Sequence, residues 1–391
     1  MWGIPMWANQ MKNRRFSLLF IGLFVAYQVL IPPLVSAQEW TWSTLQIDVE
    51  GTNSWVAVDH DGNIHLSYYA AKGGKLRYAF LPARSSQSFN MTLDQMLGDI
   101  LPQIAVDAQG NPYICYSPGI IKLAFFDGHR WNTQQIDPGS PLVSYYCSVA
   151  VGQDGMPQLI WYVAGGFILR HAILQDGMWL ARTIDTKDMP GKFNSMALDK
   201  VGRPQVSYIG LYGTKLKYAR FDGKEWIHWD LEAPTHAIAE SHGDTGMGTS
   251  IILDPLGNPM ISYFNTSSLK FTHLVDGKWK FEIIDRFPKL DEWGWKMFRS
   301  TILLDQKGNP HIGYQSSLGL KHAWWDGTRW RTQLIVAPSG ATFDGAMAID
   351  SQDNLYFSYT DPRDRTLQLA IGHPGQPSET AKIGPKKDSA N

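Results

Sequence analysis

The chain has 391 residues, of which 44% are hydrophobic and 18% are charged, and its 35 basic residues nearly balance its 36 acidic ones. This composition is that of a globular protein with ample apolar material for a core. The balanced charge speaks against a strongly basic surface that would bind nucleic acid or an anionic membrane. We therefore expect neither as a partner.

The first 37 residues are typical of an export signal. A basic cluster begins at Met11 (MKNRR), an apolar run of 16 residues follows, and Pro32-Pro33 interrupts the pattern before the small-residue sequence VSA. This order predicts cleavage after Ala37 and a mature protein that is secreted or periplasmic, with no further membrane contact. The alternative is a membrane anchor, but the apolar run is shorter than the roughly 20 residues that a spanning helix needs.

The remainder of the chain is built from repeats. An Asp that follows an apolar segment recurs at intervals of 45 to 55 residues, with Gly152 in the third place. The six aspartates are Asp59, Asp107, Asp199, Asp254, Asp305 and Asp350. Seven units with this period predict a repeat array or a propeller.

Each unit has the pattern of four short strands. An apolar strand is followed by a turn such as DHDGN or DPLGN, a strand that ends in Tyr, a third strand, and a fourth strand after an Asp-Gly turn. Apolar runs separated by Asp, Asn and Gly indicate hairpins. The repeated Asp residues are explained as turn-builders that accept backbone N–H groups, in preference to calcium ligands.

The inner strand has a large face and a small face. Val56 and Val58 flank Ala57, and the other units repeat this alternation. Sheets stacked radially need such faces, because a bulky face nests against a small one. We expect the recurrent Trp after the Asp-Gly turn to fill the wider outer gap between blades. These residues are Trp131, Trp179, Trp226, Trp279 and Trp330.

The two ends of the repeat region complement each other. Residues 39–48 match a fourth strand without the first three, and the last unit has three strands without a fourth. Pairing them would complete the seventh blade and remove exposed sheet edges. The sequence thus predicts an all-β, seven-bladed propeller of four-stranded antiparallel blades over residues 38–375. The polar residues 376–391 are expected to be disordered.

Cys115 and Cys147 are the two cysteines of the chain. They fall on strands that should be neighbours, so a single disulfide is possible. Two cysteines do not make a disulfide scaffold, and two buried free thiols are the preferred interpretation.

The Asp-Gly-x-x-Trp hairpin resembles the Asp-box, S-x-D-x-G-x-x-W, of the BNR or sialidase-like propellers. The resemblance covers five blades, but the residue between Asp and Gly and the leading Ser or Thr are missing. It implies a propeller fold. The FRIP sequence of sialidases does not occur, which argues against sialidase activity. Some polysaccharide lyases also use seven-bladed propellers, but no motif of theirs can be carried over by residue.

Two long loops are the candidate sites, because irregular loops on a rigid scaffold often carry function. Residues 233–248 contain His236, Glu240 and His242, which suit acid–base chemistry or a metal but match no metal motif. A solvated polar loop is the competing interpretation, and we expect no metal ion and no cofactor.

The second loop, residues 285–300, carries Trp293, Trp295 and Arg299, which suit stacking on a sugar and contacting its polar groups. Capping of the blade interface is the alternative for the two Trp residues. The Tyr residues that end each second strand repeat in every blade, which favours packing over a ring around a pocket. We assign this place to Tyr68, Tyr116, Tyr162, Tyr208, Tyr263, Tyr314 and Tyr359.

Export, aromatic richness and the lack of a complete catalytic constellation predict a monomeric extracytoplasmic binding module for a glycan or a protein. A lyase or glycoside hydrolase with its site at the central pocket is the first alternative. A structural repeat protein without a small ligand is the second.

Overall fold

The computed structural model describes residues 40–95, 101–137, 144–210, 215–232, 245–265, 267–287, 299–316, 318–337, 345–361 and 363–375. The expected signal peptide and C-terminal tail lie outside these residues. In the described part of the chain, no helix has the length and apolarity to cross a membrane.

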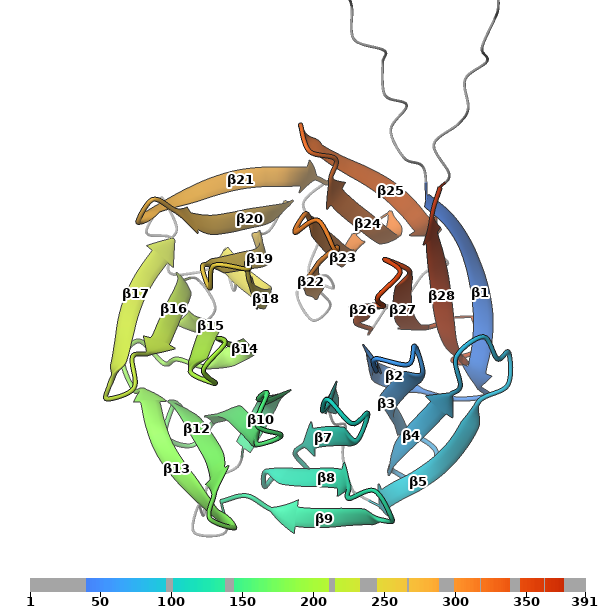
Figure 1. Cartoon of the computed structure of the whole chain (residues 1–391), viewed down its shortest axis with the longest axis horizontal. Helices are drawn as coiled ribbons and strands as arrows, with labels where there is room; N and C mark the ends of the chain where they lie inside the picture. The colour runs from blue at the N-terminus through green and yellow to red at the C-terminus, as the bar shows by residue number, and fades with distance from the viewer. Residues whose placement is uncertain are drawn as a thin grey trace, which may run out of the picture. The chain divides into compact units, whose positions relative to one another are not determined.

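The described residues form seven four-stranded antiparallel sheets, arranged as blades in a ring (Figure 1). Blade 1 comprises β2 (Thr52–Val58), β3 (Ile64–Ala70), β4 (Lys75–Leu81) and β5 (Phe89–Gln95). Blade 2 comprises β6 (Gln103–Val106), β7 (Pro112–Tyr116), β8 (Lys122–Phe126) and β9 (Trp131–Gln135). Blade 3 comprises β10 (Ser144–Val151), β11 (Pro157–Val163), β12 (Ile168–Gln175) and β13 (Met178–Asp185).

The next three blades repeat this order from the axis outward. Blade 4 comprises β14 (Lys192–Leu198), β15 (Pro204–Gly210), β16 (Lys215–Phe221) and β17 (Trp226–Glu232). Blade 5 comprises β18 (Thr245–Leu253), β19 (Pro259–Asn265), β20 (Ser268–Val275) and β21 (Lys278–Arg286). Blade 6 comprises β22 (Ser300–Leu304), β23 (Pro310–Ser316), β24 (Gly319–Trp325) and β25 (Trp330–Val336).

Blade 7 is assembled from both ends of the chain. It comprises β26 (Met347–Ile349), β27 (Leu355–Thr360), β28 (Leu367–Pro374) and, as its outer strand, β1 (Trp40–Asp48). Trp40 pairs with Pro374 and Leu45 with Leu369, and β1 lies along the outside of β28 in Figure 1. The predicted fold and its closure by an N-terminal strand are confirmed.

The turns have the predicted mechanism. Asp59 Oδ1 accepts hydrogen bonds from the backbone N–H groups of Asp61 (3.0 Å) and Asn63 (2.8 Å), and Oδ2 accepts one from the Asn63 side chain (2.8 Å). Gly62 has a φ of 81°, the left-handed conformation that glycine adopts without strain. The other five aspartates of the repeat each accept backbone N–H groups of their own turn in the same way.

The recurrent Trp residues pack between blades, as predicted. Trp131 contacts the ring of Tyr78 in the preceding blade, with ring centroids 4.8 Å apart. Trp279 contacts Tyr218 in the same way at 5.3 Å. In blade 7 the corresponding contact is made by Trp42 of β1, whose ring centroid lies 5.8 Å from that of His322 in blade 6. The N-terminal strand thus supplies the interblade Trp of blade 7.

A second device joins the blades, which we call the junction triad. A carboxylate at the end of one blade's outer strand contacts a Tyr hydroxyl and a Lys or Arg of the next blade. The triads are Asp48–Tyr68–Arg77, Asp94–Tyr116–Lys122, Asp185–Tyr208–Lys217, Glu232–Tyr263–Lys270 and Asp285–Tyr314–Lys321. The tyrosines of these five triads therefore have a structural role, and each donates its hydroxyl to a side-chain carboxylate of the neighbouring blade.

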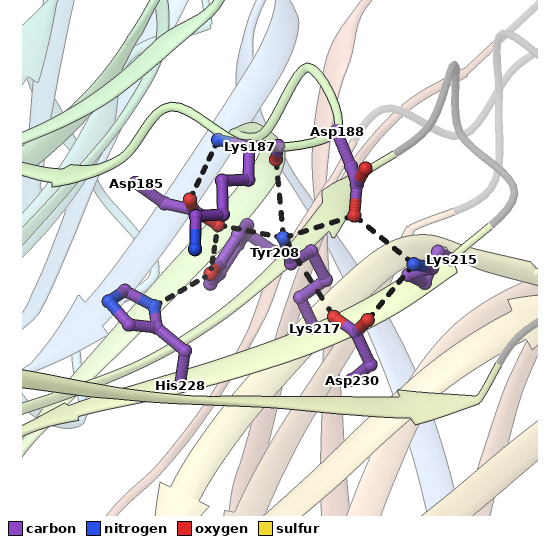
Figure 2. A network of polar contacts seen from close by, with 8 residues as sticks. All are labelled: Asp185, Lys187, Asp188, Tyr208, Lys215, Lys217, His228 and Asp230. Atoms are coloured by element: carbon purple, nitrogen blue, oxygen red, sulfur yellow. Dashed lines mark hydrogen bonds and ion pairs between the residues drawn. The ribbon is translucent and has the colours of Figure 1, made fainter.

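Figure 2 shows the most elaborate triad, between blades 3 and 4. Asp185 Oδ2 accepts a hydrogen bond from Tyr208 (2.8 Å) and pairs with Lys217 Nζ (2.8 Å), which is buried. Asp230 Oδ1 lies 3.8 Å from the same Nζ atom, and Lys215 pairs with Asp230 Oδ2 at 2.9 Å. The buried ammonium group is thus surrounded by carboxylates, as a buried charge requires.

Two junctions depart from the triad. In blade 3 the register places Trp161, and not Tyr162, opposite Arg170, so the predicted assignment of Tyr162 was wrong. Arg170 pairs with Asp137 at 2.9 Å and lies over the Trp161 ring. At the junction of blades 6 and 7, the carboxylate and cation positions hold Val336 and Gln368.

The two cysteines form a disulfide. Cys115 on β7 and Cys147 on β10 join blades 2 and 3, with their Cα atoms 6.2 Å apart. The preferred interpretation of two free thiols was wrong, because the facing surfaces of adjacent blades bring both side chains into one buried cluster.

Candidate functional site

The candidate site is a pocket at the centre of the ring. It is lined by residues at or just before the start of the inner strands of blades 1 to 6. It therefore lies on the face where the chain enters each blade. Its volume is about 50 Å³, which accommodates a few water molecules or one polar substituent of a larger ligand. We call this the loop face, because the two candidate loops, residues 233–248 and 285–300, lead in sequence into its inner strands β18 and β22.

Backbone irregularities shape this pocket. The pairing of the inner strands shifts register between Tyr145 and Ser148 in blade 3, and between Lys192 and Ser195 in blade 4. Inside these bulges, Tyr146 and Phe193 both have a φ of 48°. Left-handed conformations are costly for bulky residues and are concentrated at functional sites. The bulges turn both residues to the pocket, where their rings lie 5.0 Å apart.

Asn194 follows the blade 4 bulge and is buried. Its Nδ2 group donates hydrogen bonds to the carbonyl oxygens of Tyr146 (2.5 Å) and Gly191 (2.8 Å). Because both partners are acceptors, the orientation of the amide is fixed with Oδ1 as the remaining acceptor. Among the described residues, no donor reaches this buried Oδ1 atom.

Arg299 precedes β22 and lines the same pocket. Its Nη1 atom is buried, and the part of the chain that the structure describes offers it no hydrogen-bond acceptor. A buried donor without a partner costs about 1–3 kcal/mol, and more when it is charged. Two residues of the pocket lining thus have a buried donor and a buried acceptor that no described residue satisfies.

Acid–base groups are sparse here. No Asp, Glu or His is found among the described residues that line the pocket. Tyr146 is the titratable hydroxyl, and burial raises its pKa above the ordinary value although the charge of Arg299 opposes the shift. A phenol with a raised pKa is a poor base near neutral pH. The described lining thus consists mainly of uncharged polar groups, aromatic rings and one guanidinium group.

Of the residues predicted from the sequence, Arg299 is placed in the pocket, and its role remains a prediction. His236, Glu240, His242, Trp293 and Trp295 lie outside the described residues. None of the seven tyrosines counted in the sequence lines the pocket.

Sequence reasoning missed Tyr146, Phe193 and Asn194. One signal could have found them: a polar or aromatic residue interrupts the start of an otherwise apolar inner strand, as in KFNSMAL.

No family model matches this chain, and no curated protein matches it. Solved structures match it at low sequence identity. Polysaccharide lyase Uly1 is similar with a TM-score of 0.53 and 10% identity over 86% of this chain and 99% of that chain. The β-propeller domain of Cps50 (Swd1) from Myceliophteria thermophila is similar with a TM-score of 0.53 and 8% identity, over 84% of this chain and 98% of that chain.

A lectin of Aleuria aurantia, solved in complex with Fucalpha1-6GlcNAc, has a TM-score of 0.50 and 14% identity over 76% of this chain and all of its own. At these identities the likenesses show the fold alone. The chain is thus a seven-bladed β-propeller, a class that includes both binding proteins and enzymes.

Proposed function

We propose that this protein is an extracytoplasmic binding module that takes a glycan at the loop face, with one sugar substituent entering the central pocket. The observation that carries the proposal is that two residues lining one small cavity, Arg299 and Asn194, each have a buried polar atom, Nη1 and Oδ1, to which no described residue forms a hydrogen bond.

A hydroxyl-bearing ligand fits this pair. A hydroxyl group both donates and accepts, so one hydroxyl or two adjacent ones could accept from Arg299 and donate to Asn194. A carboxylate would satisfy Arg299 but would bring a second acceptor toward the Asn194 oxygen. The nearby rings of Trp55, Tyr146 and Phe193 supply the apolar faces that pack on sugar C–H groups.

The pocket volume limits what enters. About 50 Å³ is too small for a whole sugar ring, so most of the glycan would lie on the loops above the pocket. We expect Trp293, Trp295, His236, Glu240 and His242 to contribute contacts there. The sequence basis for an extracytoplasmic location is the export signal, and the first residue of the mature protein should be Gln38.

A lyase or glycoside hydrolase remains the alternative, and a protein partner is the other ligand considered. The described pocket lining favours binding because it contains no carboxylate and no imidazole. Glycan-array binding and a polysaccharide-degradation screen, run on the same purified protein, separate these functions.

The test uses Arg299→Gln, with Arg329→Gln as a matched control on the opposite face of the ring. We expect the wild type to bind a neutral glycan, Arg299→Gln to bind it at least about tenfold more weakly, and Arg329→Gln to bind it normally. Depolymerisation that His242→Ala abolishes would replace the proposal with the enzyme. Absence of glycan binding in all arrays would favour a protein partner.

A further inference from the structure

A second cavity lies on the opposite face of the ring, between blades 4 and 5. It is formed where the turn after β14, the turn after β18 and the hairpin after β16 meet. Its volume is about 380 Å³, which is within the range of small-molecule sites. Three of its features depart from the internal repeat, and all three departures face the same cavity.

The first departure is Arg203. Five blades have Asn at this place in the turn, and the Asn side chain donates to the turn Asp, as Asn258 does to Asp254 at 2.9 Å. Arg203 performs the same task through Nε, which donates to Asp199 Oδ2 at 2.7 Å. The turn needs only that one donor. The two terminal nitrogens of the guanidinium group are therefore additional donors beside the cavity.

The second departure is Arg220 on β16. Arg220 lies opposite Gln205, the second residue of β15. The residue at the corresponding place is His273 in blade 5 and is apolar in the other five blades. The apolar residues are Phe80, Phe125, Ile173, Trp324 and Ile371. Arg220 lies over the ring of Trp229, 5.5 Å from its centroid, and in the described chain its charge acts on Asp222 without forming an ion pair. Blade packing does not require a charge here.

The third departure is a pair of exposed aliphatic side chains. Val201 is 72% exposed and Leu256 is 87% exposed, and both line the cavity. They occupy the third place of the turn, which is polar in the other five blades: Asp61, Gln109, Asp154, Lys307 and Gln352. Exposed aliphatic groups at this place occur only in the two blades that form the cavity.

The charge of the cavity is positive. Lys200, Arg203 and Arg220 contribute cations, and Asp199 and Asp222 contribute carboxylates. Asp199 is already occupied by the N–H groups of Val201 and Arg203 and by the Arg203 side chain. Asp222 Oδ1 likewise accepts the N–H groups of its own hairpin. Donors therefore outnumber free acceptors in the cavity.

We propose that this cavity is a ligand site for a small organic anion. A carboxylate or sulfate group lies between Arg203 and Arg220, and an apolar face of the same ligand contacts Val201 and Leu256. The planar guanidinium group suits an oxyanion because its parallel N–H groups match two oxygen atoms. The anion can be a free small molecule or an acidic unit of a glycan, since both present the same chemistry.

The test measures binding of phenyl β-D-glucuronide by calorimetry, with phenyl β-D-glucoside as the neutral match. Arg203→Asn and Arg220→Ile restore residues that sister blades carry, so both variants should fold. We expect the wild type to bind the glucuronide more tightly than the glucoside. Each arginine variant should lower the affinity for the glucuronide at least about tenfold. Lys307→Gln, which removes one charge from the same face in blade 6, should leave the affinity for the glucuronide unchanged.

Hydrogen–deuterium exchange locates the site. The glucuronide should protect the turns at residues 199–203 and 254–258, and Arg299→Gln should leave that protection intact, which separates this site from the central pocket. If a polyuronate binds more tightly than the glucuronide and Arg203→Asn abolishes the difference, the source of the anion is a glycan. If the two bind equally, the source is a free small molecule. Equal affinity for glucuronide and glucoside, wild-type affinity in both arginine variants, or absence of binding would overturn the proposal.

Discussion

The hydroxyl of Tyr314 donates a 2.6 Å hydrogen bond to Asp285 Oδ2, and this bond crosses from blade 6 to the outer strand of blade 5. Tyr314 is completely buried, and Lys321 of its own blade contacts the same carboxylate oxygen. The contact belongs to a repeated set, so each such junction couples a charge on one blade to two side chains of the next. Burial and the carboxylate together raise the pKa of Tyr314 well above its ordinary value, which keeps the hydroxyl a donor.

Replacing Tyr314 with Phe should therefore destabilise the protein. The variant keeps the ring and removes only the hydroxyl, so we expect a loss of about 1–2 kcal/mol in the free energy of unfolding, measured by urea denaturation. Tyr162→Phe is the matched control, since Tyr162 is a buried tyrosine outside the triads, and it should change little. Equal effects of the two variants would contradict a structural role for the triad hydroxyl.

Acid should weaken the fold through the aspartates of the turns. Burial alone would raise the pKa of Asp305, but the imidazole of His311, 3.7 Å away, and the amide groups of Asn309 outweigh burial and bring this pKa to about 2. Since the pKa is lower in the folded state than in the unfolded chain, the stabilisation is complete above about pH 5 and is lost as the pH falls through about 4 toward 2.

Asp305→Asn should have a lower stability at neutral pH and a shallower loss below about pH 4. The free energies of unfolding of the two proteins should differ by roughly 2 kcal/mol more at neutral pH than at about pH 2. They are measured by urea denaturation at each pH. Parallel profiles for the two proteins would show that Asp305 does not titrate with folding.

Reduction of the Cys115–Cys147 disulfide should lower stability by about 4 kcal/mol, because the bond closes a loop of 32 residues between two blades. The double variant Cys115→Ser/Cys147→Ser should show a similar loss and no further effect of reductant. Thiol titration of the unfolded protein should find no free thiol before reduction and two after it. Two free thiols before reduction would restore the interpretation that the structure overturned.

Gly372 tests the ring closure. A Cβ atom at this position of β28 would lie 2.7 Å from ring atoms of Trp42 on β1. Gly372→Ala should therefore cost about 1–3 kcal/mol by thermal unfolding. In a Trp42→Ala background the same change should cost much less, and this coupling between the two residues is what the pairing of the strands requires. Additive effects would mean that the two residues do not meet.

The fold could be predicted because each blade repeats the same physical needs. The turn Asp, the left-handed Gly62 and the interblade Trp131 each leave a mark in the sequence that recurs with the period. The error at Tyr162 arose where two aromatic residues are adjacent, since only the strand register shows that Trp161 faces the junction. The neighbouring strands made a disulfide possible, but the choice between a disulfide and two thiols depends on which faces of the blades meet, which the sequence does not show.

The candidate site was harder to predict. Arg299 was singled out because it follows two Trp residues in a long loop that leads into an inner strand, a combination that suits a sugar. Tyr146 and Asn194 could not, since their placement depends on bulges at the start of the inner strands of blades 1, 3, 4 and 5. The hydrophobic pattern predicts strands but not a bulge within them, so it does not show which side chains a bulge turns to the pocket.

The pairing of Trp40 with Pro374 has a mechanical consequence. Because β1 and β28 are antiparallel, the start of the first strand and the end of the last strand lie at the same end of their ladder. Tension applied between the two termini would break these hydrogen bonds one after another, as a zipper opens, and would not load them together in shear. A propeller tethered at both ends would thus yield first at its closing strand, at a low force, while the other six blades kept their shape.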